Sequence, residues 1–102
     1  METETRVYTR YSVLTENLNV SSIIDLCREH KLDCTLYDGL GVFNGGLEDS
    51  LTVVHLAPLE ANVREEVRAL ARDIGALNKQ KEVWITEETV TLKKLLDKSP
   101  TA

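Results

Sequence analysis

The sequence is poor in several residue types, and each shortage excludes a class of protein. Its two cysteines, Cys27 and Cys34, are too few for the disulfide framework of a small secreted domain. We therefore expect reduced thiols and a cytoplasmic protein. Positive charge is scarce as well, because 12 Lys and Arg stand against 17 Asp and Glu, for a net charge of −5. Since binding to nucleic acid depends on clustered Lys and Arg, this balance argues against a general nucleic-acid binder.

Long apolar runs are also missing. No segment approaches the roughly 20 consecutive apolar residues of a membrane-spanning helix, and the opening METETRVYTR lacks the apolar core of a signal peptide. We expect no membrane partner. The composition, 42% hydrophobic and 28% charged, is that of an ordinary globular protein. The length predicts a single domain over 1–102, with frayed ends at 1–5 and 97–102.

Runs rich in β-branched and aromatic residues predict four strands. They lie at 6–15, from Cys34 into a glycine-rich stretch, at 51–58 and at 82–86. Pro58 ends the third of them, because proline cannot donate to a strand ladder. The segment 87–96 stays open between two readings, since TVTL is typical of a strand whereas KKLLDK is compatible with a helix.

Two helices are predicted between these strands. Apolar residues at spacings of three and four mark the first, over 20–30, with Asn19 as its N-cap. The second covers about 60–77 and has the clearest helical pattern in the chain, with a solvated face that includes Arg68. Its apolar stripe consists of Val63, Val67, Leu70, Ile74 and Leu77.

The order β-α-β-β-α-β is that of the ferredoxin-like α+β fold. We expect one four-stranded antiparallel sheet with two helices on one face. The strands, however, carry apolar residues on both faces: Leu51 and Val53 point one way, while Val54 and Leu56 point the other. Because two helices cover only one face, the other is predicted to be buried against another copy of the chain.

Four of the five glycines lie within Asp38–Ser50, DGLGVFNGGLEDS. A dinucleotide-binding fingerprint fails here, since it needs a glycine where Asn44 stands and a helix where a strand follows. A P-loop fails because no Gly-Lys-Ser/Thr is present. Two readings stay open: a plain hairpin, or a hairpin whose glycines let a ligand approach the backbone. The candidate ligand-binding residues are Gly39, Gly41, Phe43, Asn44, Gly45 and Gly46.

Little else in the sequence carries chemistry. No serine, cysteine or histidine arrangement resembles a catalytic triad, so we predict no catalytic residues and a protein that is not an enzyme. Cys27, His30 and Cys34 match no zinc spacing, and we predict neither a metal site nor a cofactor. Cys27 is instead predicted to be a core residue. We expect His55 to be a hydrogen-bonded histidine within a strand, and Trp84 to be a core or interface anchor.

With this element order and a long glycine-bearing hairpin between its middle strands, the chain resembles the PII and CutA type of ferredoxin-like protein over about residues 6–86. That resemblance implies a trimer whose sheets face inward, with ligands such as nucleotides or metals in clefts between subunits. PII proteins use the connection between their second and third strands for effectors, which corresponds here to Asp38–Ser50. The ACT domain shares the strand order, but its usual glycine after the first strand is missing where Glu16–Asn19 stands.

Two functions are compatible with these features. The first is a non-enzymatic homo-oligomer, preferably a trimer, that senses, binds or sequesters a small molecule. A nucleotide is one candidate ligand, held in a cleft between subunits near the hairpin. The alternative is a protein–protein interaction module without a small ligand, in which the hairpin over 38–50 contacts a basic partner through Glu48 and Asp49.

Overall fold

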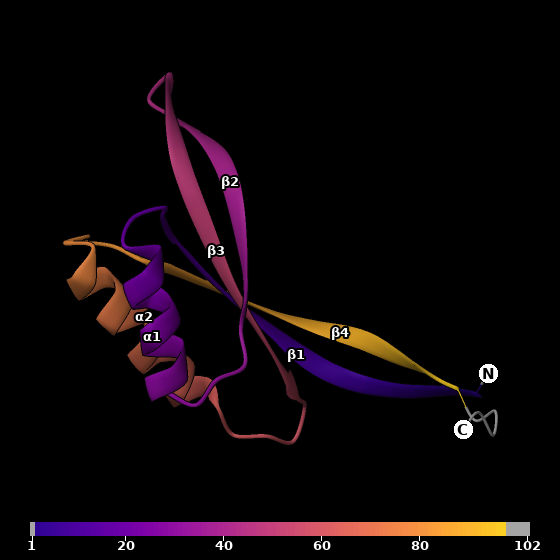
Figure 1. Ribbon diagram of the computed structural model, residues 1–102. Helices are drawn as coiled ribbons and strands as arrows, with labels where there is room; N and C mark the ends of the chain where they lie inside the picture. The colour runs from indigo at the N-terminus through magenta and orange to yellow at the C-terminus, as the bar shows by residue number, and fades with distance from the viewer. Residues whose placement is uncertain (1, 98–102) are drawn as a thin grey trace.

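The computed structural model describes residues 2–97, which form four strands and two helices (Figure 1). In chain order these are β1 (Glu2–Glu16), α1 (Val20–Glu29), β2 (Thr35–Phe43), β3 (Gly46–Pro58), α2 (Arg64–Leu77) and β4 (Trp84–Leu96). The strands form one antiparallel sheet in the order β2-β3-β1-β4. Both helices lie on the same face of this sheet (Figure 1). The expected ferredoxin-like α+β fold is confirmed.

Alternation along the strands directs one set of side chains toward the helices. Tyr11 and Val13 of β1, like Leu51 and Val53 of β3, are at most 5% exposed. They form one core with a buried stripe on each helix, which consists of Ile23 and Cys27 on α1 and Val67, Leu70, Ala71 and Ile74 on α2. Burial of these apolar side chains is the main stabilising contribution. The core position predicted for Cys27 is confirmed.

β1 and β4 continue beyond the core as a two-stranded ribbon. Glu2–Thr5, expected to be frayed, instead pair with Lys93–Leu96, so that expectation is wrong for these residues. The same pairing shows that the open segment 87–96 is strand throughout. A helix there would leave the backbone groups of β1 unpaired, whereas the ladder satisfies both chains. Residue 97 has no regular structure, and the remaining positions expected to be frayed, Met1 and 98–102, lie outside the described residues.

α1 begins at Val20 with Asn19 at its N-cap position, as predicted, whereas α2 begins later than predicted. The Asn19 side chain makes no capping hydrogen bond, and its Nδ2 donates instead to Oδ1 of Asn78 at 3.0 Å. That contact ties the start of α1 to the end of α2. α2 begins at Arg64 rather than near position 60, since the chain first turns after Pro58, whose carbonyl accepts from the amide of Ala61 at 2.9 Å.

A histidine that follows the last residue of α1 also connects this helix to α2. The ring of His30, just after α1, lies between two carboxylates of α2: Nδ1 is 2.5 Å from Oε2 of Glu66, and Nε2 is 2.7 Å from Oδ2 of Asp73. Both contacts are hydrogen bonds only when both ring nitrogens carry protons, that is, in the imidazolium form. The bonds to Glu66 and then Asp73 accordingly raise the pKa of His30 above its ordinary value. The sequence reading missed this clamp.

A second apolar surface lies on the sheet face away from the helices. Leu14, Leu56 and Trp84 are 37%, 42% and 57% exposed, and Leu14 pairs directly with Trp84. Directly paired residues share a face, and these side chains point away from the buried Val13 and Val53. Apolar residues thus occupy both faces, as the sequence pattern predicts, and the chain's own helices cover one of them.

Two arms leave the sheet in different directions (Figure 1). One is the β2–β3 hairpin, which contains the glycine-rich stretch. The other is the β1–β4 ribbon, which carries both ends of the described chain. Together they extend the molecule to 53 Å along its longest axis, against 29 and 28 Å along the others. A large part of both arms is therefore available for contacts outside the core.

The stripe on α2 predicts very different responses at neighbouring positions. Val67 is 1% exposed, so Val67→Asp should unfold the domain, because an unpaired buried carboxylate removes several kcal/mol from a total stability of about 5–15 kcal/mol. Arg68→Asp should lower stability by no more than about 1 kcal/mol, since Arg68 is exposed and loses only a surface ion pair with Glu65. Thermal melts followed by circular dichroism measure both. Equal losses of stability in the two variants would mean that the buried face of α2 has been assigned incorrectly.

The His30 clamp predicts a pH-dependent stability. Because the folded-state pKa is raised, the stabilisation is fully present below 6.5, the ordinary histidine value, and is lost as pH rises through the folded pKa. Urea unfolding at a series of pH values should show this loss in the wild type. His30→Gln should flatten the dependence in that window, while the control His55→Gln, which leaves the clamp intact, should retain it. A wild-type slope that survives His30→Gln would contradict the clamp.

Candidate ligand-binding cleft

The glycine-rich stretch forms a hairpin with a two-residue turn. Asn44 and Gly45 have φ values of 49° and 79°, so both adopt left-handed conformations, as a type I′ turn requires. β2 and β3 pair up to this turn, with Phe43 opposite Gly46. Of the two open readings, the hairpin topology is therefore established, and Gly39, Gly41 and Gly46 are strand residues.

Two strand glycines make room for particular neighbours. A Cβ at Gly39 would lie 2.7 Å from Oγ of Ser50, its direct partner on β3, which is too close for two non-bonded atoms. A Cβ at Gly41 would instead make ordinary contact with the ring of Phe43, at 3.6 Å. Gly41 thus lies beside the Phe43 ring, and together they form one wall of a cleft.

This cleft, with a volume of about 480 Å³, lies between the hairpin arm and the end of the sheet. Four separate segments line it: Leu14, Thr15 and Glu16 of β1, Gly41 and Phe43 of β2, Glu48, Asp49 and Ser50 of β3, and Gln80, Glu82 and Trp84 around the start of β4. Of the six predicted ligand-binding residues, Gly41 and Phe43 line the cleft. Gly39 packs against Ser50, and Asn44, Gly45 and Gly46 lie at the arm's tip.

Two exposed aromatic side chains line the cleft. Phe43 is 59% exposed and Trp84 is 57% exposed. Trp84 lies on an edge strand and on the face away from the helices, so the expectation that it could be a core residue is wrong. Its indole Nε1 donates to Oε1 of Glu82 at 2.8 Å. That bond leaves the flat faces of the ring free for stacking.

A polar network holds one wall of the cleft in place. Asn78, which is 8% exposed, donates from Nδ2 to Oγ1 of Thr15 at 3.2 Å and to the Glu16 carbonyl at 3.4 Å. The Thr15 hydroxyl in turn donates to Oε1 of Gln80, which also accepts from the Glu16 amide at 3.5 Å. These bonds fasten the connection after α2 to the end of β1. Buried, fully paired polar groups of this kind rigidify the segment that carries them.

The cleft is acidic. Four carboxylates line it, from Glu16, Glu48, Asp49 and Glu82, and no Lys or Arg of residues 2–97 does so. Carboxylates accept hydrogen bonds and attract cations, and they repel phosphate groups. The cleft therefore suits a ligand with a flat apolar part, several hydrogen-bond donors and no dense negative charge.

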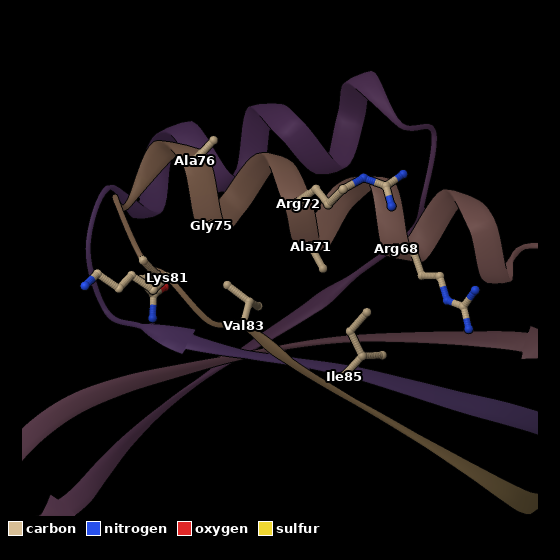
Figure 2. A pocket seen from close by; sticks show the side chains of 9 residues that line it. Arg68, Ala71, Arg72, Gly75, Ala76, Lys81, Val83 and Ile85 are labelled. Carbon is tan, nitrogen blue, oxygen red and sulfur yellow. The ribbon is translucent and has the colours of Figure 1, made fainter.

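A second cavity, of about 350 Å³, lies between α2 and β4 (Figure 2). Ala71, Val83 and Ile85 face this space, while Arg68, Arg72 and Lys81 extend from its rim in different directions (Figure 2). Because these cations do not converge, the cavity offers no single point of charge for a ligand. The acidic cleft remains the better candidate.

Within residues 2–97 no group of three or more His, Cys, Asp or Glu side chains is arranged to hold a metal ion. None of the described helices is long and apolar enough to cross a membrane. His55 lies in β3, and its Nδ1 donates to the carbonyl of Asp33 at 2.8 Å, as expected of a hydrogen-bonded strand histidine.

Solved structures with the same architecture exist, although no protein-family model and no curated protein sequence matches the chain. The PII-like nitrogen regulatory protein CPII of Thiomonas intermedia, bound to ADP, AMP and bicarbonate, has a TM-score of 0.60 at 10% identity, covering 91% of this chain and 100% of that one. A phage SAM lyase in complex with S-methyl-5′-thioadenosine has a TM-score of 0.60 at 14% identity, covering 86% and 90%. A DUF3240 family protein of Shewanella baltica has a TM-score of 0.54 at 12% identity, covering 93% and 96%.

The chain has a PII-like ferredoxin fold. The resemblance drawn from element order is confirmed at the level of the fold. Identities of 10–14% show a shared fold and do not transfer a ligand or an activity. The fold also hosts both regulatory proteins and an enzyme, so function has to be argued from the cleft.

Proposed function

We propose that the protein is a non-enzymatic small-molecule-binding protein whose cleft takes an adenosine-containing ligand. The observation that carries this proposal is the pair of exposed aromatic rings, Phe43 and Trp84, in an acidic cleft of about 480 Å³. A cleft of that volume is within the range of small-molecule sites. Exposed aromatic rings beside hydrogen-bond acceptors are a common way to hold a nucleoside.

Each part of a nucleoside has a counterpart in the cleft. The purine ring can stack on the face of Phe43 or Trp84, and such stacking contributes about 1–3 kcal/mol per base. The ribose hydroxyls are donors, and carboxylates such as Glu16 or Glu48 accept from such groups, as an acidic residue does in dinucleotide-binding folds. Gly41, without a side chain, lets the ligand come close to the β2 backbone.

The ligands of the similar structures support this choice. CPII was found with ADP and AMP, and the phage lyase with S-methyl-5′-thioadenosine. Adenine joined to a ribose ring is the part that these molecules share. The acidic lining of the present cleft favours those members of the group that carry no phosphate, because carboxylates and phosphates repel each other.

The proposal also holds that the protein binds its ligand without converting it chemically. The cleft contains the hydroxyls of Thr15 and Ser50, but no His, Lys or Cys of the described chain lines it to activate them. The Thr15 hydroxyl is moreover engaged with Gln80. The lyase shows that this fold can be enzymatic, so the proposal depends on these lining residues and not on the fold.

We further propose that the protein assembles through its open sheet face, with a trimer as the expected form. Leu14, Leu56 and Trp84 leave apolar side chains uncovered on this face in the single chain, beside the Arg10–Glu88 ion pair. A second copy that covers it would also approach Trp84, and thus complete the cleft from the far side. A cytoplasmic location fits this proposal, and the two unpaired cysteines agree with it.

A protein contact through the hairpin arm is the second candidate function. Leu40, Val42 and Leu47 are 66%, 68% and 74% exposed. Leu40 and Val42 alternate with Gly41 and Phe43, and Val42 pairs with Leu47, so these three side chains share the face opposite Phe43. This apolar face could dock on a protein, independently of a ligand on the other side.

Calorimetric titration with four ligands tests the binding proposal. We expect affinity to fall from S-methyl-5′-thioadenosine and adenosine to AMP and then ADP, because each phosphate adds negative charge in an acidic cleft. Phe43→Ala and Trp84→Ala should each weaken binding about tenfold or more, since a stacking surface is removed. The matched control is Leu40→Ala, an exposed apolar residue on the opposite face of the same arm, which should bind as the wild type does.

Three outcomes would contradict the binding proposal. No binding of any of the four ligands would refute the adenosine proposal. Binding of ADP above all others would contradict the charge argument. If Leu40→Ala changes affinity as much as Phe43→Ala does, the effect comes from the arm as a whole and the cleft assignment is wrong.

Light scattering tests the assembly proposal. The wild type should have about three times the 11.5 kDa mass of the chain at micromolar concentration. Val54→Glu places a charge on the open face between Ser12 and Thr35 and should shift the mass toward the monomer, because an unpaired charge at an apolar interface is strongly unfavourable. The control Leu40→Glu lies on the arm, away from that face, and should leave the mass unchanged. A wild-type monomer would refute the proposal.

A further inference from the structure

Two cysteines lie at the two ends of the connection between α1 and β2. Cys27 is in the last turn of α1, and Cys34 directly precedes β2. The connection folds back on itself: Lys31 has a φ of 56°, and the amide of Leu32 donates to the Cys27 carbonyl at 3.1 Å. Leu32 is 7% exposed and belongs to the core, so this return of the chain is anchored.

The return brings both side chains to one cavity. Cys27 and Cys34 line the same space of about 610 Å³, together with apolar residues such as Ile24 and Leu36. Cys27 is 5% exposed, whereas Cys34 is partly exposed. A small reagent can therefore enter beside Cys34 and meet both thiols.

The two thiols differ in acidity. A hydrogen bond from the Cys34 thiol lowers the pKa of Cys27 to about 7, with a smaller contribution from the positive charge of His30. The Cys27 sulfur, burial and the Asp33 carboxylate raise the pKa of Cys34. Near neutral pH the pair thus combines a partly ionised Cys27 with a protonated Cys34, which is the arrangement of a reactive and a resolving cysteine.

We propose that Cys27 and Cys34 are a redox site that forms a reversible intramolecular disulfide in response to a small hydroperoxide. The inference is independent of the cleft and its ligand. It uses a motif, CREHKLDC, to which the sequence reading assigned no chemistry beyond a core position for Cys27.

The reaction balances with the peroxide as the only oxidant. The Cys27 thiolate attacks one peroxide oxygen, the O–O bond breaks, and the products are a Cys27 sulfenic acid and, after protonation, one water or alcohol. The Cys34 sulfur then attacks the Cys27 sulfur and expels the hydroxyl as water. Two thiols are oxidised by two electrons, their two protons end in the released molecules, and the peroxide is reduced. A thiol reductant reverses the step by disulfide exchange.

The disulfide would act on the root of the hairpin arm. It joins the last turn of α1 to the residue before Thr35, the first residue of β2, the strand that carries Gly41 and Phe43. The neighbouring Asp33 carbonyl already accepts a hydrogen bond from His55 of β3. Oxidation would add a covalent restraint at this point, so the arm would start from a more rigid base.

Intact-mass analysis of the purified chain tests the proposal. The reduced protein is treated with hydrogen peroxide at neutral pH and is then unfolded and exposed to N-ethylmaleimide. We expect a monomeric product that takes up no maleimide and is about 2 Da lighter than the reduced chain, because two hydrogens are lost. Dithiothreitol should restore two sites of alkylation. In Cys34→Ser no internal disulfide can form, and dimedone should trap Cys27 as the sulfenic acid.

A second measurement separates a redox site from two merely buried thiols. Alkylation of Cys27 by iodoacetamide should have a midpoint near pH 7 in the wild type, and Cys34→Ser should move it. Wild-type protein that keeps two alkylatable thiols after peroxide would overturn the proposal, as would a disulfide between two chains. Equal dimedone trapping in the wild type and in Cys34→Ser would also overturn it, since Cys34 would then not resolve the sulfenic acid.

Discussion

The double pairing of β1 is the interaction on which the rest of the molecule depends. β1 pairs with β3 over residues 8–16 and with β4 over residues 2–14, so it holds together the two halves of the fold. Its register points Val13 at the helices and Leu14 at the open face. A slip of one residue would exchange these faces and expose the core. The same register sets Glu16 opposite Ser50 and Leu14 opposite Trp84, and thereby builds the cleft.

The open face of the sheet and the cleft have one side chain in common. Trp84 belongs both to that face and to the cleft wall. A ligand that stacks on Trp84 and a second subunit that covers the face would compete for the ring or share it. Under the proposed function, ligand binding and assembly are therefore energetically linked, because each changes the environment of the same side chain. The hairpin arm contributes the other wall of the cleft. Its first strand begins at Thr35, directly after Cys34 of the cysteine pair.

The sequence was sufficient for the fold wherever a pattern is local. The stripe of α2 repeats over five apolar positions, and the strands of the core are rich in β-branched residues, so element type and order followed from short-range rules. The ribbon formed by β1 and β4 beyond the core did not follow from such short-range rules. Glu2–Thr5 are strand only because Lys93–Leu96 are available to pair with them, and neither segment has a strong preference alone. The His30 clamp was missed for a similar reason, since its carboxylates lie on a helix that meets α1 only in the folded chain.

The candidate site was predictable only in part, because glycine content reports on the backbone and not on the ligand. Gly45 is required by the turn and Gly39 by the closeness of Ser50, so two of the glycines that drew attention to the stretch have local roles. Gly41 and Phe43 reach the cleft, but six of its eleven lining residues lie outside the glycine-rich stretch, in β1 and around the start of β4. The acidic charge of the cleft could not be predicted from the sequence either. A net charge of −5 says nothing about position, whereas the fold brings four carboxylates from three separate segments to one cleft. Under the proposed function, that convergence, and not the glycine motif, is what favours an uncharged nucleoside over a nucleotide as the ligand.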